Sequence, residues 1–326
     1  MKKNVEKKRC LCPGNLINAT SSRSLEPAVP QKHRKRTKIS EQVFLFGRMI
    51  KFSHTVFALP FALSAVVLAG RLHSISWAKI FWILLAMIGA RSAAMGFNRI
   101  ADAAFDARNP RTSTRDIPAG RLSLNASKLF VIVFSCLFIF SAAMLGRICF
   151  YFSVPVLAVL FFYSYTKRFT CLAHLYLGFA ISLAPAGAWV AVTNTFSWPI
   201  LLLCMALLTY IAGFDVLYSC QDLEFDKIEG LFSIPARFGT KRALFISSVL
   251  HLFSFGFFFM LLIAFDMNSI YLVTVVIIGL LFFLEHRLVK PDDLRNVSFA
   301  FFHVNSLISV ILFIGVLADE FFRRWM

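Results

Sequence analysis

The amino-acid sequence predicts an all-α, polytopic membrane protein with about nine transmembrane helices. Hydrophobic residues make up 58% of its 326 residues and charged residues only 16%, and the mean hydropathy is +0.72. These values are typical of integral membrane proteins and exclude an ordinary soluble domain. After the first fifty residues, mostly apolar runs of roughly 17–25 residues recur, and each is long enough to cross a bilayer as a helix.

Helices are the expected form of these runs because backbone exposed to lipid must satisfy its own hydrogen bonds. We expect one membrane domain over residues 43–326. Its predicted spans are, in order, 52–70, 79–97, 127–146, 149–165, 172–192, 198–217, 243–264, 269–286 and 298–317.

Residues 1–42 differ from the rest of the chain, because they are polar and basic. The segment ends in the run Lys32-His33-Arg34-Lys35-Arg36-Thr37-Lys38 and has no apolar stretch of signal-peptide type. We expect a disordered cytoplasmic tail. Contact of its basic side chains with anionic lipid headgroups is favoured over a nucleic-acid arm, so we expect no nucleic-acid partner.

The formal net charge of +17 is distributed in a way that predicts membrane topology. Outside the tail, four loops on the side of the N-terminus hold most of the basic residues, and the loops between them hold far fewer. By the positive-inside rule, the N-terminus and these four loops face the cytoplasm, and we expect the cell's inner (plasma) membrane. The loops follow the second, fourth, sixth and eighth spans and contain Arg108, Arg111, Arg115, Arg121 and Lys128; Lys167 and Arg168; Lys227, Arg237, Lys241 and Arg242; and Arg287 and Lys290.

An acidic cluster, Asn98-x3-Asp102-x3-Asp106, lies where the second span ends. Carboxylates four residues apart project from one face of a helix. Mg²⁺ prefers oxygen ligands and commonly bridges protein carboxylates to a substrate phosphate. The cluster therefore has the composition of half of a site for Mg²⁺ and a diphosphate.

A second cluster, Asp215-x6-Asp222-x3-Asp226, follows the sixth span, four spans later and on the same side of the membrane. Tyr218 lies between its first two acids on the same helical face. The two clusters are a weak internal repeat. If the bundle brings the two helix ends together across a central cavity, they form one site.

The loop after the first cluster contains Pro and Gly, which end a helix, and four arginines, Arg108, Arg111, Arg115 and Arg121. Arginine presents a planar set of donors that suits phosphate oxygens. The alternative is a positive-inside loop that contacts lipid headgroups. The neighbouring carboxylates favour the phosphate role.

Such a site suits the ionisation of an allylic diphosphate. Carboxylate-bound Mg²⁺ and basic side chains would stabilise the charge that develops on the leaving diphosphate. The carbocation that remains must be shielded from water in an apolar pocket, where aromatic faces stabilise positive charge. The 38 phenylalanines of the chain supply such faces, although most aromatic residues in a membrane protein contact lipid.

Taken in order, five elements resemble the UbiA family of intramembrane aromatic prenyltransferases over residues 44–317. One residue departs from the pattern, because Arg99 stands where many members have Asp. Ser53–Phe61 and Tyr218–Asp222 resemble the 4-hydroxybenzoate polyprenyltransferase-like branch. The five elements are Asn98-x3-Asp102-x3-Asp106, Arg111-Thr112-x2-Arg115-x2-Pro118-x-Gly120, Tyr165-Thr166-Lys167-Arg168, Asp215-x2-Tyr218-x3-Asp222-x3-Asp226 and Arg237-Phe238-Gly239.

The resemblance implies a nine-span bundle whose central cavity opens to the lipid and is capped on the cytoplasmic side. It implies Mg²⁺ as cofactor, and polyprenyl diphosphate and an aromatic acid as substrates. The implied metal ligands are Asn98, Asp102, Asp215 and Asp222, supported by Asp106 and Asp226. The implied substrate contacts are Arg115, Lys167, Arg168 and Lys227. Arg111 is added to them because of its place in the arginine-rich loop. The candidate catalytic residues are Asp102, Asp215, Asp222 and Tyr218.

The implied reaction transfers a polyprenyl group to a 4-hydroxybenzoate-like acid in ubiquinone or menaquinone biosynthesis. Other acceptors stay open: a naphthoate, a futalosine-pathway compound or a haem vinyl group. A cation-coupled transporter is the alternative from another class, but its site would lie near the bilayer midplane, whereas both acidic clusters lie at span ends. A catalytically inactive scaffold disagrees with the retention of the acids.

Other polar residues have a structural and a functional interpretation. Ser53 and His54 could reach the acceptor or form an interhelical hydrogen bond. We expect His174 and His303 to be hydrogen-bonded core histidines, because isolated imidazoles supply no metal-ligand set. We expect Glu285 and His286 to be solvated at the membrane interface.

Overall fold

The structure, a computed structural model, describes residues 39–50, 57–291, 293–295 and 297–325. Most of the predicted tail, together with Ser53 and His54, lies outside the described residues. Within them, the regular structure is helical, and one isolated β-bridge joins Lys290 and Asp293. The helices are α1 Ile39–Met49, α2 Leu59–Ala69, α3 Trp77–Ala101, α4 Ala103–Arg108, α5 Leu124–Leu145, α6 Arg147–Thr166, α7 Ala173–Thr193, α8 Trp198–Ser219, the 3₁₀ turn η2 Cys220–Asp222, α9 Leu223–Ile228, α10 Ile234–Ala264, α11 Ser269–Leu288, α12 Val297–Phe299, the π-helical turn η3 Ala300–Val304 and α13 Asn305–Trp325.

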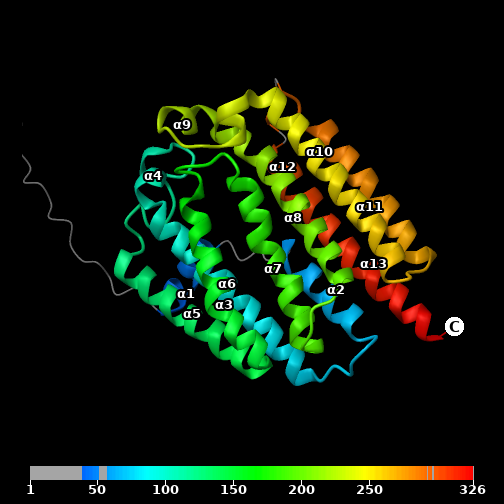
Figure 1. Ribbon diagram of the computed structural model, residues 1–326. Coiled ribbons are helices and arrows are strands. Elements are labelled where there is room, and N and C mark those ends of the chain that lie inside the picture. Colours follow the sequence, from blue (N-terminus) through cyan, green and yellow to red (C-terminus); the bar gives the residue numbers. More distant parts are fainter. Residues whose placement is uncertain (1–38, 51–56, 292, 296, 326) are drawn as a thin grey trace, which may run out of the picture. The chain divides into compact units, whose positions relative to one another are not determined.

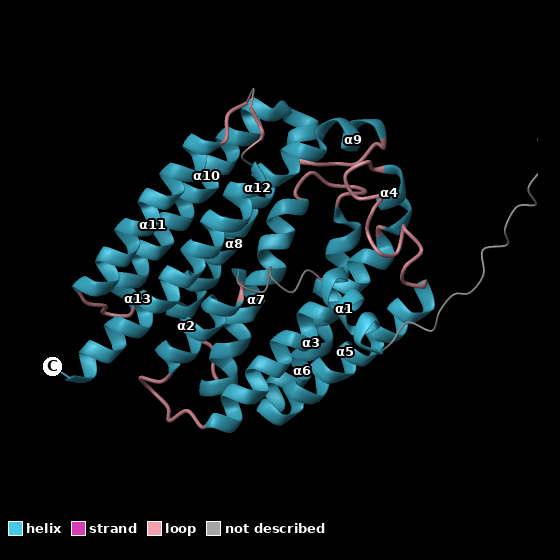
Figure 2. Cartoon of the chain, turned by 180° about the vertical axis from the view of Figure 1, so that it is seen from behind, coloured by secondary structure: helices cyan, strands magenta, loops and turns pink. Residues whose placement is uncertain are grey.

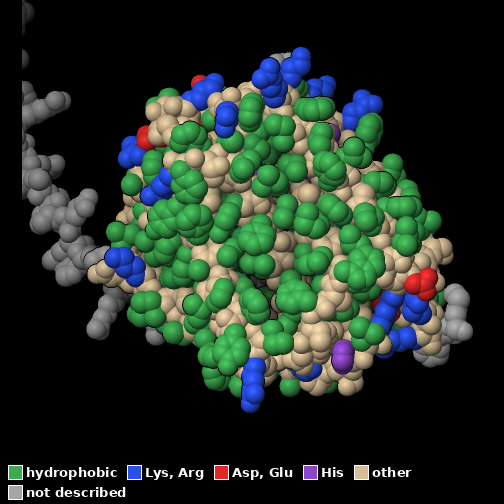
Figure 3. Space-filling model, viewed as in Figure 1, with side chains coloured by type: hydrophobic (Ala, Val, Ile, Leu, Met, Phe, Trp, Pro, Cys, Tyr) green, Lys and Arg blue, Asp and Glu red, His purple; other side chains and the backbone are tan. Residues whose placement is uncertain are grey.

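Eight helical segments of the described chain are long and apolar enough to cross a membrane, and they coincide with the second to ninth predicted spans. The first predicted span, 52–70, corresponds to α2, an apolar helix of eleven residues. The all-α membrane fold is therefore confirmed. In Figure 3, hydrophobic side chains cover the middle of the visible face, and Lys and Arg lie around its rim, as expected of a surface in contact with lipid.

Serine residues begin three of the long helices. The side chains of Ser76, Ser123 and Ser233 accept hydrogen bonds from backbone N–H groups three residues later, at 3.2–3.3 Å. Each thereby satisfies a donor that the first turn of a helix leaves without an intrahelical partner. These caps fix where α3, α5 and α10 begin.

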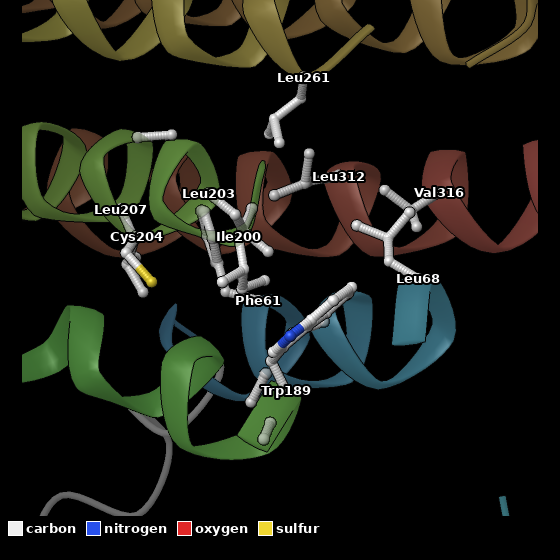
Figure 4. Close-up of a cluster of buried hydrophobic side chains, with 14 of the residues drawn as sticks. Phe61, Leu68, Trp189, Ile200, Leu203, Cys204, Leu207, Leu261, Leu312 and Val316 are labelled. Atoms are coloured by element: carbon white, nitrogen blue, oxygen red, sulfur yellow. The ribbon is translucent and has the colours of Figure 1, made fainter. Parts of the chain in front are cut away.

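Helix α8 is the central helix of the main hydrophobic core. In its apolar window 72% of the residues are buried, compared with 17% in α6. The core gathers side chains from α2, α7, α8, α10, α11 and α13, and Figure 4 shows Phe61, Trp189 and Leu203 among them. The second acidic cluster thus begins on the helix that is most firmly enclosed.

Small residues let neighbouring helices approach closely. A Cβ atom added to Gly178 of α7 would lie 2.2 Å from the carbonyl oxygen of Leu208 in α8. At Gly89 of α3 it would lie 2.9 Å from the backbone nitrogen of Phe138 in α5. Such contacts between small residues and a facing backbone are typical of membrane helices.

The weak internal repeat seen in the sequence is also present in the backbone, where each acidic cluster spans a break at the end of a long helix. Helix α3 breaks at Asp102 (φ −93°, ψ 1°) and continues as the six-residue α4, and α8 ends in η2 at Asp222 (φ −101°, ψ 6°) and continues as the six-residue α9. Both views of the ribbon place α4 and α9 side by side. Arg108, at the end of α4, pairs with Glu229, the residue after α9, at 2.7 Å.

The expectation of solvation is wrong for Glu285, and His286 is only partly exposed. Glu285 has no exposed surface and accepts a hydrogen bond of 2.8 Å from the side chain of Asn305. His286 Nε2 lies 3.0 Å from Nδ1 of the buried His251. Because α10 and α13 pack against the end of α11, these polar side chains pair with one another inside the bundle.

Candidate active site

Both acidic clusters line one polar cavity of about 170 Å³. Its walls come from the junction of α3 and α4, the loop after α4, the end of α6, and the segment from α8 to α9. The expected meeting of the two helix ends is therefore confirmed. The predicted site residues that line this cavity are Asn98, Asp102, Asp106, Arg111, Arg115, Lys167, Arg168, Asp215, Tyr218, Asp222 and Asp226.

Arg111 connects the loop after the first cluster to the second cluster. Its Nε donates to Asp222 Oδ1 at 2.8 Å, and its Nη2 also contacts the other carboxylate oxygen. Its Nη1 donates to the Tyr218 hydroxyl at 2.7 Å. Asn109 donates to the same carboxylate at 3.2 Å. The loop thus closes over the cavity through a two-pronged ion pair, the strong geometry for arginine and carboxylate.

The acids of the first cluster are held by their own neighbours and by α6. Asp106 accepts from Arg115 Nη1 at 2.6 and 2.7 Å. Asp102 accepts from Asn98 at 2.8 Å and lies 3.8 Å from Arg168 Nη2. Burial raises the pKa of Asp102 to about 6, and the nearby carboxylate of Asp106 adds to the rise.

Lys167 lies among the carboxylates of both clusters. Burial alone would lower the pKa of its ammonium group, but Asp226, Asp215, Asp222 and Asp102 together raise that pKa above its usual value. Its Nζ is 3.8 Å from Asp226 Oδ2, an oxygen that is buried without a hydrogen-bond partner in the described part of the protein. Lys167 is therefore charged at neutral pH.

Asp215 is held by a histidine. Its Oδ2 lies 2.7 Å from Nδ1 of His174, the second residue of α7, whose side chain is fully buried. Nε2 of the same ring accepts the backbone N–H of Ile234 at 3.3 Å. The expectation of a hydrogen-bonded core histidine is confirmed for His174 and wrong for His303, which is exposed and stacks on Phe299. The sequence did not indicate which carboxylate His174 contacts, because His174 and Asp215 are 41 positions apart.

The metal-ligating side chains of the cavity suit Mg²⁺ better than a metal ion that is bound by protein side chains alone. Among the described residues, no three His, Cys, Asp or Glu side chains are grouped so that they could hold one ion. Mg²⁺ is usually bound by one or two carboxylates together with water and substrate phosphates. The buried, unpartnered oxygen of Asp226 is a donor suited to such an ion. The assignment of individual ligands stays a prediction.

A second, apolar cavity of about 330 Å³ adjoins the polar one. It lies among α3, α5, α6 and α7, and Asn98 and Tyr163 line both cavities. Along α3 its lining extends from Asn98 to Ile83, about 22 Å at the helical rise per residue. A long hydrophobic compartment therefore lies next to the polar cavity, with Asn98 and Tyr163 in the walls of both.

Arg91 lines the apolar cavity, and the sequence analysis did not single it out. Its Nε is buried without a hydrogen-bond partner, and no carboxylate of the described chain forms an ion pair with it. An arginine inside an apolar span, seven residues before Asn98, was the available signal, because such charges in membrane helices commonly mark functional positions.

Lys227 and Arg99 differ from the other basic residues discussed for the polar cavity, because neither pairs with an acid of that cavity. Lys227 is not in the lining of either cavity and pairs with Glu224 at 3.7 Å on the surface. Arg99 lines the polar cavity and is buried, and it donates to the backbone oxygen of Met49 in α1 at 3.3 Å. Arg99 thus connects α1 to the site.

Comparisons with known proteins agree with this architecture. The model of the UbiA prenyltransferase family matches residues 58–307. A 4-hydroxybenzoate octaprenyltransferase of Francisella tularensis subsp. novicida is 31% identical over 261 residues, which cover 77% of this chain and 88% of that protein. The corresponding enzyme of Vibrio campbellii is 27% identical over 243 residues, covering 74% and 84%.

Solved structures show the same fold. The apo structure of a UbiA homolog from Aeropyrum pernix K1 has a TM-score of 0.75 and 31% identity, and covers 82% of this chain and 98% of that one. A UbiA homolog from Archaeoglobus fulgidus, bound to GPP and Mg²⁺, has a TM-score of 0.64 and 18% identity, with coverage of 84% and 99%.

Proposed function

The chain belongs to the UbiA prenyltransferase family and is an integral membrane prenyltransferase, and we propose that it transfers a polyprenyl group from polyprenyl diphosphate to the ring of 4-hydroxybenzoate. The reaction requires Mg²⁺ and forms a precursor of ubiquinone. The observation that carries the proposal is that the two cavities adjoin: both acidic clusters line the polar cavity, and the apolar cavity shares Asn98 and Tyr163 with it.

In this proposal Asn98, Asp102, Asp215 and Asp222 hold Mg²⁺, and Asp106 and Asp226 support them. Bound Mg²⁺ supplies charge stabilisation to the leaving diphosphate. Oxygen donors of carboxylate and amide groups are the type that this ion prefers. The A. fulgidus homolog, which shares the fold, is itself bound to Mg²⁺ and GPP.

The basic side chains of the polar cavity bind the donor's diphosphate. Arg111, Arg115, Lys167 and Arg168 all line the cavity and carry the positive charge that a diphosphate needs. Each already faces a carboxylate, so the cavity is close to electrically balanced before substrate enters. The Tyr218 hydroxyl, hydrogen-bonded to Arg111, orients this arginine toward the diphosphate.

The apolar cavity receives the prenyl chain and keeps water from the cation. The allylic carbon–oxygen bond breaks, and the electron pair leaves with the diphosphate. Aromatic faces near the junction of the cavities, including Tyr163, stabilise the carbocation. The ring carbon beside the acceptor's hydroxyl then forms the new carbon–carbon bond, and loss of the ring proton restores aromaticity.

Arg91 is placed to bind the carboxylate of the acceptor. It is about 10 Å from Asn98 along α3, as seven residues at the helical rise require. A benzoic acid whose carboxylate pairs with Arg91 would direct its ring toward the junction of the cavities. The Nε of Arg91, which is buried without a hydrogen-bond partner in the described part of the chain, gains much from such an anion.

The proposal includes an orientation of the protein in the membrane, which is inferred from the distribution of Lys and Arg among the loops. The loops after α3, α6, α8 and α11 are rich in Lys and Arg, so the positive-inside rule places the polar cavity on the cytoplasmic side of the inner membrane. Residues 1–42 would be a cytoplasmic tail that precedes the membrane domain.

A naphthoate or a futalosine-pathway acceptor, which would place the enzyme in menaquinone synthesis, is the second candidate. Arg91 would serve any acceptor that carries a carboxylate, so the discrimination has to be measured. The experiment is prenyl transfer by the purified protein in lipid, with a polyprenyl diphosphate and each acceptor in turn, with Mg²⁺ and with EDTA. We expect Mg²⁺-dependent prenylation of 4-hydroxybenzoate; prenylation of only the naphthoate or the futalosine-type compound would overturn this choice of acceptor.

Replacement of Arg91 tests the acceptor site itself. Arg91→Met should raise the KM for 4-hydroxybenzoate at least about tenfold and leave the KM for the donor near its original value, because one charge-assisted contact is lost. Arg287→Met, which removes an arginine at the end of α11 outside both cavities, is the matched control. An unchanged KM for the acid in Arg91→Met would remove Arg91 from the acceptor site.

A further inference from the structure

His174 contacts Asp215 from outside the substrate cavities. The histidine is fully buried and is absent from the lining of both cavities, whereas Asp215 lines the polar one. The ring nitrogen Nδ1 lies 2.7 Å from Asp215 Oδ2. His174 therefore does not line the substrate cavities, and its direct contact with the polar cavity is the carboxylate of Asp215.

The second ring nitrogen determines the tautomer. Nε2 accepts the N–H of Ile234 at 3.3 Å, and a backbone N–H can only donate. Nε2 is therefore unprotonated, the proton of the neutral ring is on Nδ1, and Nδ1 donates to Asp215. One ring thus joins the beginnings of α7 and α10 to the carboxylate on α8.

Asp215 differs from the other acids of the cavity because, in the described part of the chain, its side chain pairs with a neutral histidine and forms no ion pair with Lys or Arg. Asp106, Asp222 and Asp226 face Arg115, Arg111 and Lys167, and Asp102 lies near Arg168. A cationic partner competes with a metal ion for the carboxylate. A neutral donor fixes the orientation of the side chain and leaves its negative charge in place, which is how hydrogen bonds from outside the coordination shell support metal ligands.

We propose that His174 is a positioning residue that holds Asp215 in the orientation in which its carboxylate binds the metal ion. This inference rests on the proposed function, because it assumes that Asp215 is a metal ligand. The loop before α10 reinforces the arrangement: Phe232 N–H donates to the Lys167 oxygen at 2.7 Å, so the segment that presents the Ile234 N–H is itself fixed.

Two isosteric replacements separate the two hydrogen bonds of the ring. In His174→Asn, the amide nitrogen occupies the position of Nδ1 and retains a donor for Asp215. In His174→Gln, the amide reaches the position of Nε2 and retains only the contact with Ile234. His174→Phe keeps the ring volume and removes both. The readout is Mn²⁺ binding in the presence of inorganic diphosphate, followed by electron paramagnetic resonance, together with the Mg²⁺ concentration that gives half-maximal transfer.

We expect His174→Asn to bind Mn²⁺ within about threefold of the unmodified protein, and His174→Gln and His174→Phe to bind about tenfold or more weakly, as losses of such supporting hydrogen bonds commonly do. Thermal unfolding of each variant separates this effect from misfolding. Equal binding by all four proteins, or an Asn variant as weak as the Phe variant, would overturn the role. If the unmodified protein bound no Mn²⁺, the metal site of the proposed function would fail together with it.

Discussion

The charge of Asp102 changes with pH near pH 6. Burial, with a contribution from Asp106, raises the pKa of its carboxyl group to about 6. Above that pH the group is an anion that can bind Mg²⁺, and below it a proton competes with the metal. Metal affinity should therefore fall as pH decreases through 6, approaching tenfold per pH unit.

Mn²⁺ titrations in the presence of inorganic diphosphate, between pH 5 and pH 8, measure this dependence. Asp102→Asn is the matched variant, because its amide cannot titrate. The Asn variant should bind Mn²⁺ more weakly at every pH, and its affinity should depend less on pH. Because protonation of diphosphate affects both proteins equally, the difference between the two curves reports Asp102 alone. Parallel curves for the two proteins would contradict titration of Asp102 in this range.

The spacing of the acids predicted which side chains line the cavity, but it did not predict their partners. Asp102 and Asp106 are four residues apart, so their common face follows from helix geometry. Arg111 pairs with Asp222 across 111 positions, a contact that only the tertiary structure creates. Glu285 was predicted to be solvated for the same reason, since the approach of Asn305 from α13 has no local sequence signal.

The contact between α7 and α8 gives a prediction for stability. Gly178→Ala would place a methyl group 2.2 Å from the carbonyl oxygen of Leu208, so the two helices must move apart. Overpacking of this kind costs about 1–3 kcal/mol. We expect a Tm lower by several degrees in detergent, measured by thermal unfolding.

Gly187→Ala on the same helix is the control, because its added Cβ would meet no atom within 4 Å. Alanine is the better helix former, so this change should leave Tm unchanged or raise it slightly. Equal Tm values for the two variants would show that α7 and α8 do not pack as closely at Gly178 as described.

Element boundaries were predicted best where composition changes sharply. The spans of α6, α7 and α11 were placed within two residues of their ends. α10 begins nine residues before the predicted span, at Ile234, because Ser233 caps it and Pro235 fits its first turn. The polar pair Lys241 and Arg242 had indicated a loop, yet the helix continues through them after a break at Gly239, whose φ of 78° suits glycine.

The fold class and the order of the spans were predictable, whereas the cavities were not. Hydropathy over about 20 residues depends only on local composition, so it identified eight long helices and the shorter α2. The meeting of the two acidic helix ends depends on how α3 and α8 are placed in the bundle, which no local pattern determines. The internal repeat indicated that the two helix ends could meet, and in the structure both acidic clusters line one cavity.

In the proposed reaction, the two acidic clusters act together on one diphosphate. The most direct test measures prenylated 4-hydroxybenzoate and released diphosphate in the same reaction for the unmodified protein, Asp102→Asn and Asp215→Asn, each in lipid with Mg²⁺ and with EDTA. We expect equimolar products from the unmodified protein with Mg²⁺ alone, and a loss of about 100-fold or more in each folded variant, because charge stabilisation at the leaving group is removed. Transfer at an undiminished rate by either variant would contradict this proposal.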